Sequence, residues 1–241
     1  MPKLLTAFLL LFCLALPACT PPSAPPAGPD APPAAEFPVI EIRTETVRYR
    51  NEQINVDLAY PVLGGLADPD RAATINHFIA AAALAFKDNL EQEAQAWADR
   101  AAADGSGFLP YSAAVTYDVP YNRDGLLSIR INYESYTGGA HGAAARKTLN
   151  LDTVTGAELH LGDFFHPESD YLTHIREEII NRINAAPDDY FPDAAAGLTV
   201  PADQFYLTDG AVVVYFAEYA IAPYAAGMPE FSIRAERRLQ K

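Results

Sequence analysis

Cysteine is scarce in this chain of 241 residues, which contains only Cys13 and Cys19. Cys13 lies inside an apolar stretch near the N-terminus, so removal of that stretch on export would leave Cys19 alone. An exported protein with one Cys cannot form an internal disulfide. We therefore expect the hydrophobic core alone to hold the fold, and we expect no metal site built on cysteine thiolates.

The apolar segment near the N-terminus is too short to form a typical membrane-spanning helix. Lys3 precedes an apolar segment, residues 4–16, which is shorter than the about 20 residues that a spanning helix needs. A positive residue, a short apolar run and small residues before a cleavage point are typical of an export signal. Leu16, Ala18 and Cys19 resemble a lipobox, in which the Cys thiol is acylated; the alternative is an ordinary signal with a chance Cys.

The expected start of the mature chain is therefore a lipidated Cys19 after a signal peptide at residues 1–18. Residues 19–36 are rich in Pro and Ala and cannot form a core, which predicts a disordered or extended tether. Acyl chains, such as palmitate, would anchor the protein to a membrane. Because Thr20 rather than Asp follows the Cys, the expected location in a cell with two membranes is the outer membrane, facing the periplasm or the surface.

Positive charge is in short supply, with 17 Lys and Arg against 31 Asp and Glu and a net charge of -14. Such a surface repels nucleic acid and favours cationic partners. The alternative is that the acidic surface only keeps the protein soluble. Half of the residues are hydrophobic, including 13 Tyr and 12 Phe, so the remaining chain from residue 37 can bury a sizeable core.

Apolar periodicity predicts an α+β fold with mainly antiparallel sheets and two principal helices. A long helix is expected at residues 69–103, capped by Asp68 or Asp70, and a second at 168–186. The stripe expected to face the core is Ile75, Ile79, Ala82, Phe86, Leu90, Ala94 and Trp97 in the first helix, and Leu172, Ile175, Ile179 and Ile183 in the second. Strands are expected at 37–49, 53–60, 111–119, 126–136, 146–152, 204–207, 211–216 and 230–234.

Signatures of catalytic and metal sites are missing. The sequence has no HExxH, GxSxG or P-loop pattern. His160, Asp163 and His166 are close in sequence and could meet a metal, but a surface loop with a capping Asp explains them as well. Acidic pairs at 177–178 and 188–189 and Ser106 in a turn do not define catalytic chemistry, and His77 is expected to be a partly exposed helical residue. We expect no enzyme activity, no catalytic residues, no metal and no cofactor.

A glycine-rich loop between two expected strands is the most function-like segment. Its three glycines allow a close backbone approach, its N–H groups could bind an anion, and His141 adds an imidazole side chain. The candidate ligand-binding residues are Tyr136, Thr137, Gly138, Gly139, His141, Gly142 and, from a later loop, Tyr224. The alternative is a tight strand connection in which His141 caps a carbonyl. Tyr219, Tyr224 and Phe231 could line a groove or pack the last strands.

Four landmarks in order resemble a known extracytoplasmic family. They are residues 136–142, 150–165, 205–210 and 221–227. The first part, residues 37–145, is similar to the N-terminal accessory domain of a peptidoglycan deacetylase. The second part, residues 146–241, is similar to the C-terminal domain of the lysozyme-binding anti-sigma-V factor. The resemblance implies a binding module associated with the cell wall, without the deacetylase's catalytic domain.

The sequence thus predicts a lipid-anchored, non-enzymatic binding protein of the cell envelope. The expected ligands are a cationic protein such as lysozyme, or peptidoglycan fragments. Two alternatives remain open: a hydrolase acting on peptidoglycan, and a structural envelope lipoprotein that binds no small ligand.

Overall fold

The computed structural model describes Phe37 and residues 39–239, which contain two α-helices and eight strands. The predicted signal peptide, the lipidated Cys19 and the tether lie outside the described residues. Within the described part, neither helix is both long enough and apolar enough to span a bilayer. Residues 36–241 form one compact unit with hydrophobic cores of its own.

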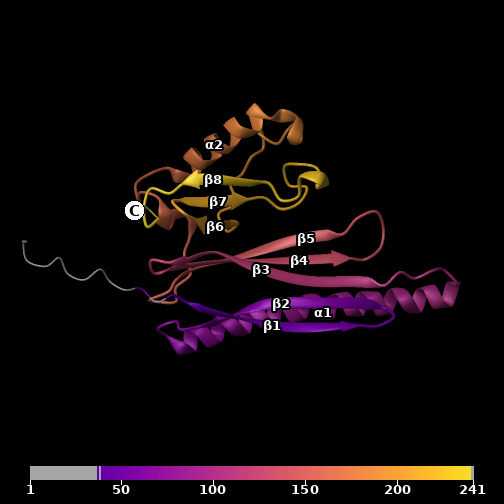
Figure 1. Cartoon of the computed structure of the whole chain (residues 1–241). Coiled ribbons are helices and arrows are strands. Elements are labelled where there is room, and N and C mark those ends of the chain that lie inside the picture. The colour runs from indigo at the N-terminus through magenta and orange to yellow at the C-terminus, as the bar shows by residue number, and fades with distance from the viewer. Residues whose placement is uncertain (1–36, 38, 240–241) are drawn as a thin grey trace, which may run out of the picture. The chain divides into compact units, whose positions relative to one another are not determined.

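The first half of this unit builds a five-stranded sheet in the order β1-β2-β3-β4-β5 (Figure 1). Its strands are β1 Glu41–Arg50, β2 Ile54–Gly64, β3 Tyr111–Arg123, β4 Leu126–Tyr136 and β5 Ala143–Asp152. All neighbours are antiparallel except β2 and β3. That parallel pair arises because the chain crosses over through a long helix between the two strands.

Helix α1, Pro69–Asp104, covers one face of this sheet. The Asp68 side chain accepts hydrogen bonds from two backbone N–H groups of the first turn, and Gly105 ends the helix in the left-handed conformation at φ 72°. The predicted core stripe is wrong at Ala82, which is exposed, and at Trp97, whose exposed fraction is 42%. The buried face runs from Ala94 to Ala101, so Trp97 is rotated about 60° away from it.

Strand ends also differ from the predicted ones. Strand β3 continues to Arg123 through an irregularity between Asp118 and Tyr121, so the hairpin turn contains only Asp124 and Gly125. Strand β5 begins at Ala143 and pairs with β4 along its length. The predicted division between residues 145 and 146 therefore falls inside a strand of the first sheet.

The second half builds a smaller sheet, β6-β7-β8, with a helix on one face. Its elements are η1 Leu161–Phe164, α2 Tyr171–Ala185, η2 Pro187–Asp189, β6 Phe205–Thr208, β7 Ala211–Tyr215, η3 Tyr224–Ala226 and β8 Glu230–Arg234. Ile175, Ile179 and Ile183 of α2 are buried, as predicted. Leu172 is 39% exposed, against expectation, because it lies in the first turn of a helix that starts at Tyr171 rather than at residue 168.

The arrangement confirms the predicted α+β class with mainly antiparallel sheets and two principal helices. The other face of the smaller sheet carries Tyr206, Val213 and Tyr215, and polar contacts from this side reach β4 and β5. Figure 1 shows the smaller sheet beside β3, β4 and β5, on the side away from α1. These contacts position the candidate site.

Candidate ligand-binding site

The glycine-rich loop joins the ends of β4 and β5. Gly138 and Gly139 have φ angles of 94° and 95°, which side chains other than hydrogen rarely allow. A Cβ at Gly142 would lie 2.5 Å from the Ser135 carbonyl oxygen, so only glycine fits that close approach. The Tyr136 hydroxyl donates a hydrogen bond to the Gly139 carbonyl oxygen at 2.9 Å. Backbone geometry, rather than packing, therefore sets the shape of this loop.

A second loop, residues 216–229, connects β7 to β8 and contains η3. Tyr219 has a positive φ of 61°, which is uncommon for a bulky residue, and its side chain is 51% exposed. Five residues later, Tyr224 begins the short η3 helix and is half-buried. This loop therefore presents two tyrosine rings close together, with centroids 5.9 Å apart.

The two loops meet at His141. Its ring stacks on Tyr224 with centroids 4.0 Å apart, and its Nε2 lies 3.2 Å from the Tyr219 hydroxyl oxygen. Its Nδ1 lies 2.8 Å from the Gly142 carbonyl oxygen. Because a carbonyl only accepts, Nδ1 carries the proton in the neutral ring, and Nε2 accepts from Tyr219. His141 therefore caps a backbone carbonyl, which was one of the two alternatives that the sequence allowed. It also forms a surface together with a loop about 80 residues later in the chain.

The Glu218 carboxylate connects the second loop to the end of the first through a hydrogen bond. The Glu218 side chain accepts a hydrogen bond of 3.0 Å from the backbone N–H of Ala144, at the start of β5. The structure thus brings His141 and Tyr224 together, as one candidate site requires, and adds Glu218 and Tyr219. Phe231, the third aromatic residue considered, is buried and packs against Phe216, so it belongs to the core.

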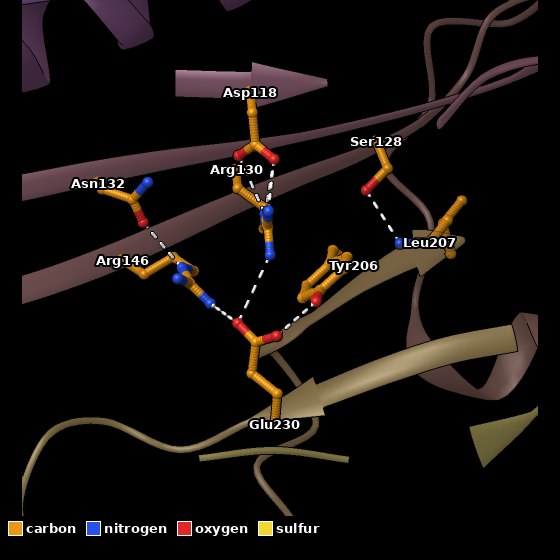
Figure 2. A network of polar contacts seen from close by, with 8 residues as sticks. All are labelled: Asp118, Ser128, Arg130, Asn132, Arg146, Tyr206, Leu207 and Glu230. Carbon is orange, nitrogen blue, oxygen red and sulfur yellow. Dashed lines mark hydrogen bonds and ion pairs between the residues drawn. The ribbon is translucent and has the colours of Figure 1, made fainter. Parts of the chain in front are cut away.

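A polar network fixes the far end of the second loop, where β8 begins (Figure 2). Glu230 accepts a hydrogen bond of 2.7 Å from the Tyr206 hydroxyl and forms ion pairs with Arg130 and Arg146. Asp118 also accepts from Arg130, with Nε 2.9 Å from Oδ1. These bonds tie β8 to β4 and β5, and therefore hold the loop that carries Tyr219 and Tyr224 against the first sheet.

Burial and charge shape the chemistry of this network. Burial, reinforced by the Glu230 carboxylate, raises the pKa of Tyr206 to about 12. The hydrogen bond that Arg130 donates to the Asp118 carboxylate raises the pKa of Arg130, which stays charged. The Arg130 guanidinium also lies 4.4 Å from the Tyr206 ring centroid, and Arg146 lies 5.2 Å from that of Tyr215. Each cation therefore contacts both a carboxylate and an aromatic ring.

Two buried side chains join the sheets beside this network. The Ser128 hydroxyl donates to Asn150 Oδ1 at 2.7 Å and accepts from the backbone N–H of Leu207 at 3.0 Å. The Asn150 amide donates to the Phe205 carbonyl oxygen at 2.9 Å. Strand β6 is an edge strand, so these side chains satisfy backbone groups that would otherwise lack a partner strand.

The other residues considered from the sequence lie elsewhere. His160 and Asp163 form a reciprocal cap at η1, and the backbone N–H of His166 donates to Glu236. Within the described part of the chain, no group of three or more His, Cys, Asp or Glu side chains is placed to hold a metal. Glu178 pairs with Arg182 on α2.

Sequence reasoning missed the residues that hold the two loops together. Glu218, Glu230, Arg130 and Arg146 are isolated charges in strands and loops, and no spacing pattern links them. One signal was present: Ser128 and Asn150 are polar, and each lies between two large apolar residues of its strand. Buried polar groups require partners, so such residues indicate contacts with another element.

Comparisons with known proteins agree with the two-part resemblance. Residues 47–144 match the family described as deacetylase PdaC, and residues 162–236 match a protein family of unknown function, DUF3298. The chain is similar to the peptidoglycan-N-acetylmuramic acid deacetylase PdaC of Bacillus subtilis, at 29% identity over 53% of this chain and 28% of that protein. It is also similar to the anti-sigma-V factor RsiV of the same organism, at 26% identity over 80% of this chain and 66% of that protein.

Solved structures of DUF3298 proteins share the fold. One from Bacteroides fragilis has a TM-score of 0.64 and 20% identity, covering 83% of this chain and 92% of that one. Another from Pseudomonas aeruginosa PAO1 has a TM-score of 0.54 and 22% identity, covering 83% and 93%. The chain therefore contains a PdaC-like region followed by a DUF3298 region, the two-part organisation that its motifs predicted.

Proposed function

We propose that this protein is a lipid-anchored, non-enzymatic binding protein of the cell envelope, and that its ligand is lysozyme or a cell-wall component. One observation carries the proposal. His141, from the glycine-rich loop, stacks on Tyr224 and hydrogen-bonds Tyr219, although these tyrosines belong to a loop on the other sheet. We call the surface of His141, Tyr219 and Tyr224 the aromatic platform.

The aromatic platform suits recognition of a wall fragment. Stacked, partly exposed rings offer flat apolar faces, and their hydroxyl and ring nitrogen offer hydrogen bonds at the edges. A pyranose ring has the matching pattern, with an apolar C–H face and a polar rim. Gly138 and Gly139, in the loop that carries His141, are open to solvent, since a Cβ at either position would contact nothing within 4 Å.

A cationic protein would bind through charge as well as through the rings. The chain carries a net charge of -14, which favours encounter with a basic partner such as lysozyme. The relatives support a link to the envelope, because one is named as an enzyme acting on peptidoglycan and the other as an anti-sigma factor. This chain spans 28% and 66% of their lengths, so their full activities do not transfer to it.

The test is binding of residues 37–241 to immobilised lysozyme at two salt concentrations, and to soluble muropeptides by calorimetry. We expect at least one ligand to bind, and binding of lysozyme to weaken as salt screens the charges over about 8–10 Å. His141→Ala and Tyr219→Ala should each weaken that binding on the order of tenfold, or about 1.4 kcal/mol. His166→Ala, an exposed histidine far along the chain, is the matched control. No binding of either ligand at low salt would contradict the proposal.

The anchor is tested separately in cells. Metabolic labelling with palmitate should mark the wild-type protein and leave a Cys19→Ala variant unlabelled and released from membranes. A labelled Cys19→Ala variant, or an unlabelled wild type, would remove the anchor from the proposal without affecting the aromatic platform.

A further inference from the structure

An apolar groove lies on the opposite face of the five-stranded sheet from the polar network. Helix α1 packs mainly against β2 and β3, which leaves part of the same sheet face over β4 and β5 uncovered. Ile131 and Leu149 line the groove from the sheet, and Ile75, Phe78 and Ala82 line it from the helix. Its volume is about 440 Å³, within the range of about 300–1,000 Å³ that is typical of small-molecule pockets.

Apolar side chains at the edge of this groove are exposed to solvent, which distinguishes it from an ordinary gap beside a helix. Phe78 is 68% exposed at its edge, the largest exposed fraction of any aromatic side chain in the described part of the chain. Ala82, at the next turn, is also exposed. Solvent-facing apolar side chains over a cavity favour an apolar occupant, because binding would remove that surface from water.

The rim of the groove is cationic in a strongly acidic protein. Arg71 and Lys147 line it, against one carboxylate, Glu158. Among residues 37 and 39–239, neither cation forms an ion pair of 4 Å or less, whereas Arg130, Arg146 and Arg238 each do. Lys147 is exposed and lies on β5, opposite Ile131 of β4. Among the described residues, the rim therefore offers two positive charges that no carboxylate neutralises in an ion pair.

The chain holds Arg71 in place at this rim. The Arg71 Nε donates to the Gly156 carbonyl oxygen at 3.0 Å. Gly156 has a φ of 68°, and a Cβ there would lie 2.7 Å from Arg71 Cγ. A glycine is thus needed both for the turn and for the close approach of the arginine stem. The hydrogen bond therefore holds the Arg71 side chain at the rim of the groove, while the residue stays exposed.

We propose that this groove binds a single-chain amphiphile with an anionic head, of the fatty-acid class. The acyl chain would lie between Phe78, Ala82 and the sheet, and the carboxylate would contact Arg71 and Lys147. This site is separate from the aromatic platform and does not depend on the proposed function.

The test uses two amphiphiles of opposite charge whose alkyl tails differ by one methylene, titrated below their aggregation concentrations into residues 37–241. Dodecanoate should bind with one site per chain, and dodecyltrimethylammonium should bind on the order of tenfold more weakly or not at all. Nonspecific binding would show the reverse preference, because the chain as a whole carries a net charge of -14. A flat dodecanoate titration or a preference for the cation would overturn the proposal.

Variants locate the site. Ala82→Trp fills the groove from an exposed helix position and should abolish dodecanoate binding, whereas Ala73→Trp, exposed on the other side of the same helix, should bind as wild type does. Lys147→Glu should weaken dodecanoate on the order of tenfold and should improve binding of the cation. Equal binding by Ala82→Trp and Ala73→Trp would overturn the assignment. A dimer in light scattering that Ala82→Trp dissociates would assign the groove to a second copy instead.

Discussion

The two faces of the five-stranded sheet are covered through different kinds of contact. The face toward α1 is apolar, and its strands contribute Leu58, Val115 and Ile129, all fully buried. The face toward β6–β8 carries Ser128 and Arg130, which alternate with Ile129 on β4, and Asn150 of β5. One face depends on nondirectional burial of surface, and the other on hydrogen bonds of specified partners.

We expect the two faces to contribute differently, one to the stability of the fold and the other to the placement of β6 and β8. Apolar packing tolerates small shifts of α1, whereas the polar face fixes β6 and β8 relative to β4 and β5 through individual atoms. The aromatic platform needs that second kind of contact, because its rings come from loops attached to different sheets. We therefore expect the apolar face to dominate unfolding free energy, and the polar face to control how the two loops meet.

The largest effect is expected from the apolar face. Ile129→Ala removes a fully buried side chain beneath α1 and should lower the free energy of unfolding by about 2–5 kcal/mol. Ile129→Val, which deletes one methylene, should cost only about 0.5–1.5 kcal/mol. Guanidinium unfolding followed by circular dichroism measures both. A loss below 1 kcal/mol in the alanine variant would show that α1 contributes little to the core.

The next largest effect is expected one residue away, on the polar face. Ser128→Ala leaves the Leu207 N–H without its acceptor and should cost about 1–3 kcal/mol. Hydrogen exchange should accelerate in β6 more than in β2, because the edge of the smaller sheet loses its attachment. Ser135→Ala, near the end of the same strand, is the control. Equal acceleration in β2 and β6 would mean that the polar face does not position the smaller sheet.

Alkaline pH should weaken the same interface to a smaller extent. The folded pKa of Tyr206, raised to about 12, lies above the ordinary value of 10.0. Its contribution to stability is therefore complete below about pH 10 and is lost as the pH rises toward 12, because the unfolded chain releases the proton first. Tyr206→Phe should flatten this part of the pH dependence, and Glu230→Gln should reduce it. Parallel unfolding curves at about pH 9 and pH 11 test both, and an unchanged slope in Tyr206→Phe would contradict the assignment.

The smallest effect is expected on the solvent-exposed part of the polar face, which the smaller sheet does not cover. Arg48 and Asp57 pair across β1 and β2, with side chains 65% and 58% exposed. Such pairs contribute about 0–1 kcal/mol because water and salt screen them. A double-mutant cycle of Arg48→Ala and Asp57→Ala should thus give a coupling energy at the low end of that range. A coupling of 2 kcal/mol or more would show that the polar face is stabilising even without the second sheet.

Much of the secondary structure could be predicted because periodicity is a local property. Strands β4 and β8 have the predicted bounds, and the cap at Asp68 was one of two expected. Errors occurred where burial depends on another element. Trp97 and Leu172 fit helical spacing, yet both are exposed, because Trp97 is rotated away from the buried face of α1 and Leu172 lies in the first turn of α2.

The candidate site was predicted only in part. The glycines predicted a constrained loop, and the positive φ angles of Gly138 and Gly139 agree with that prediction, since glycine adopts this conformation more readily than other residues. Pairing of His141 with Tyr219 was not predictable, because a lone histidine and a lone tyrosine have no sequence relation across 78 positions. Ligand binding by these residues stays a prediction until it is measured.

The sequence by itself determined the alternation of apolar and polar residues, the turns that need glycine, the acidic balance and the two-part resemblance, because each depends on residue type and near neighbours. The tertiary structure alone decided which face of each strand met which layer. It brought Glu230 to Arg130 and Arg146, and it left the groove beside Phe78 open. Those contacts depend on how α1 and the smaller sheet cover a five-stranded sheet, and burial of the whole chain, rather than any local pattern, sets that arrangement.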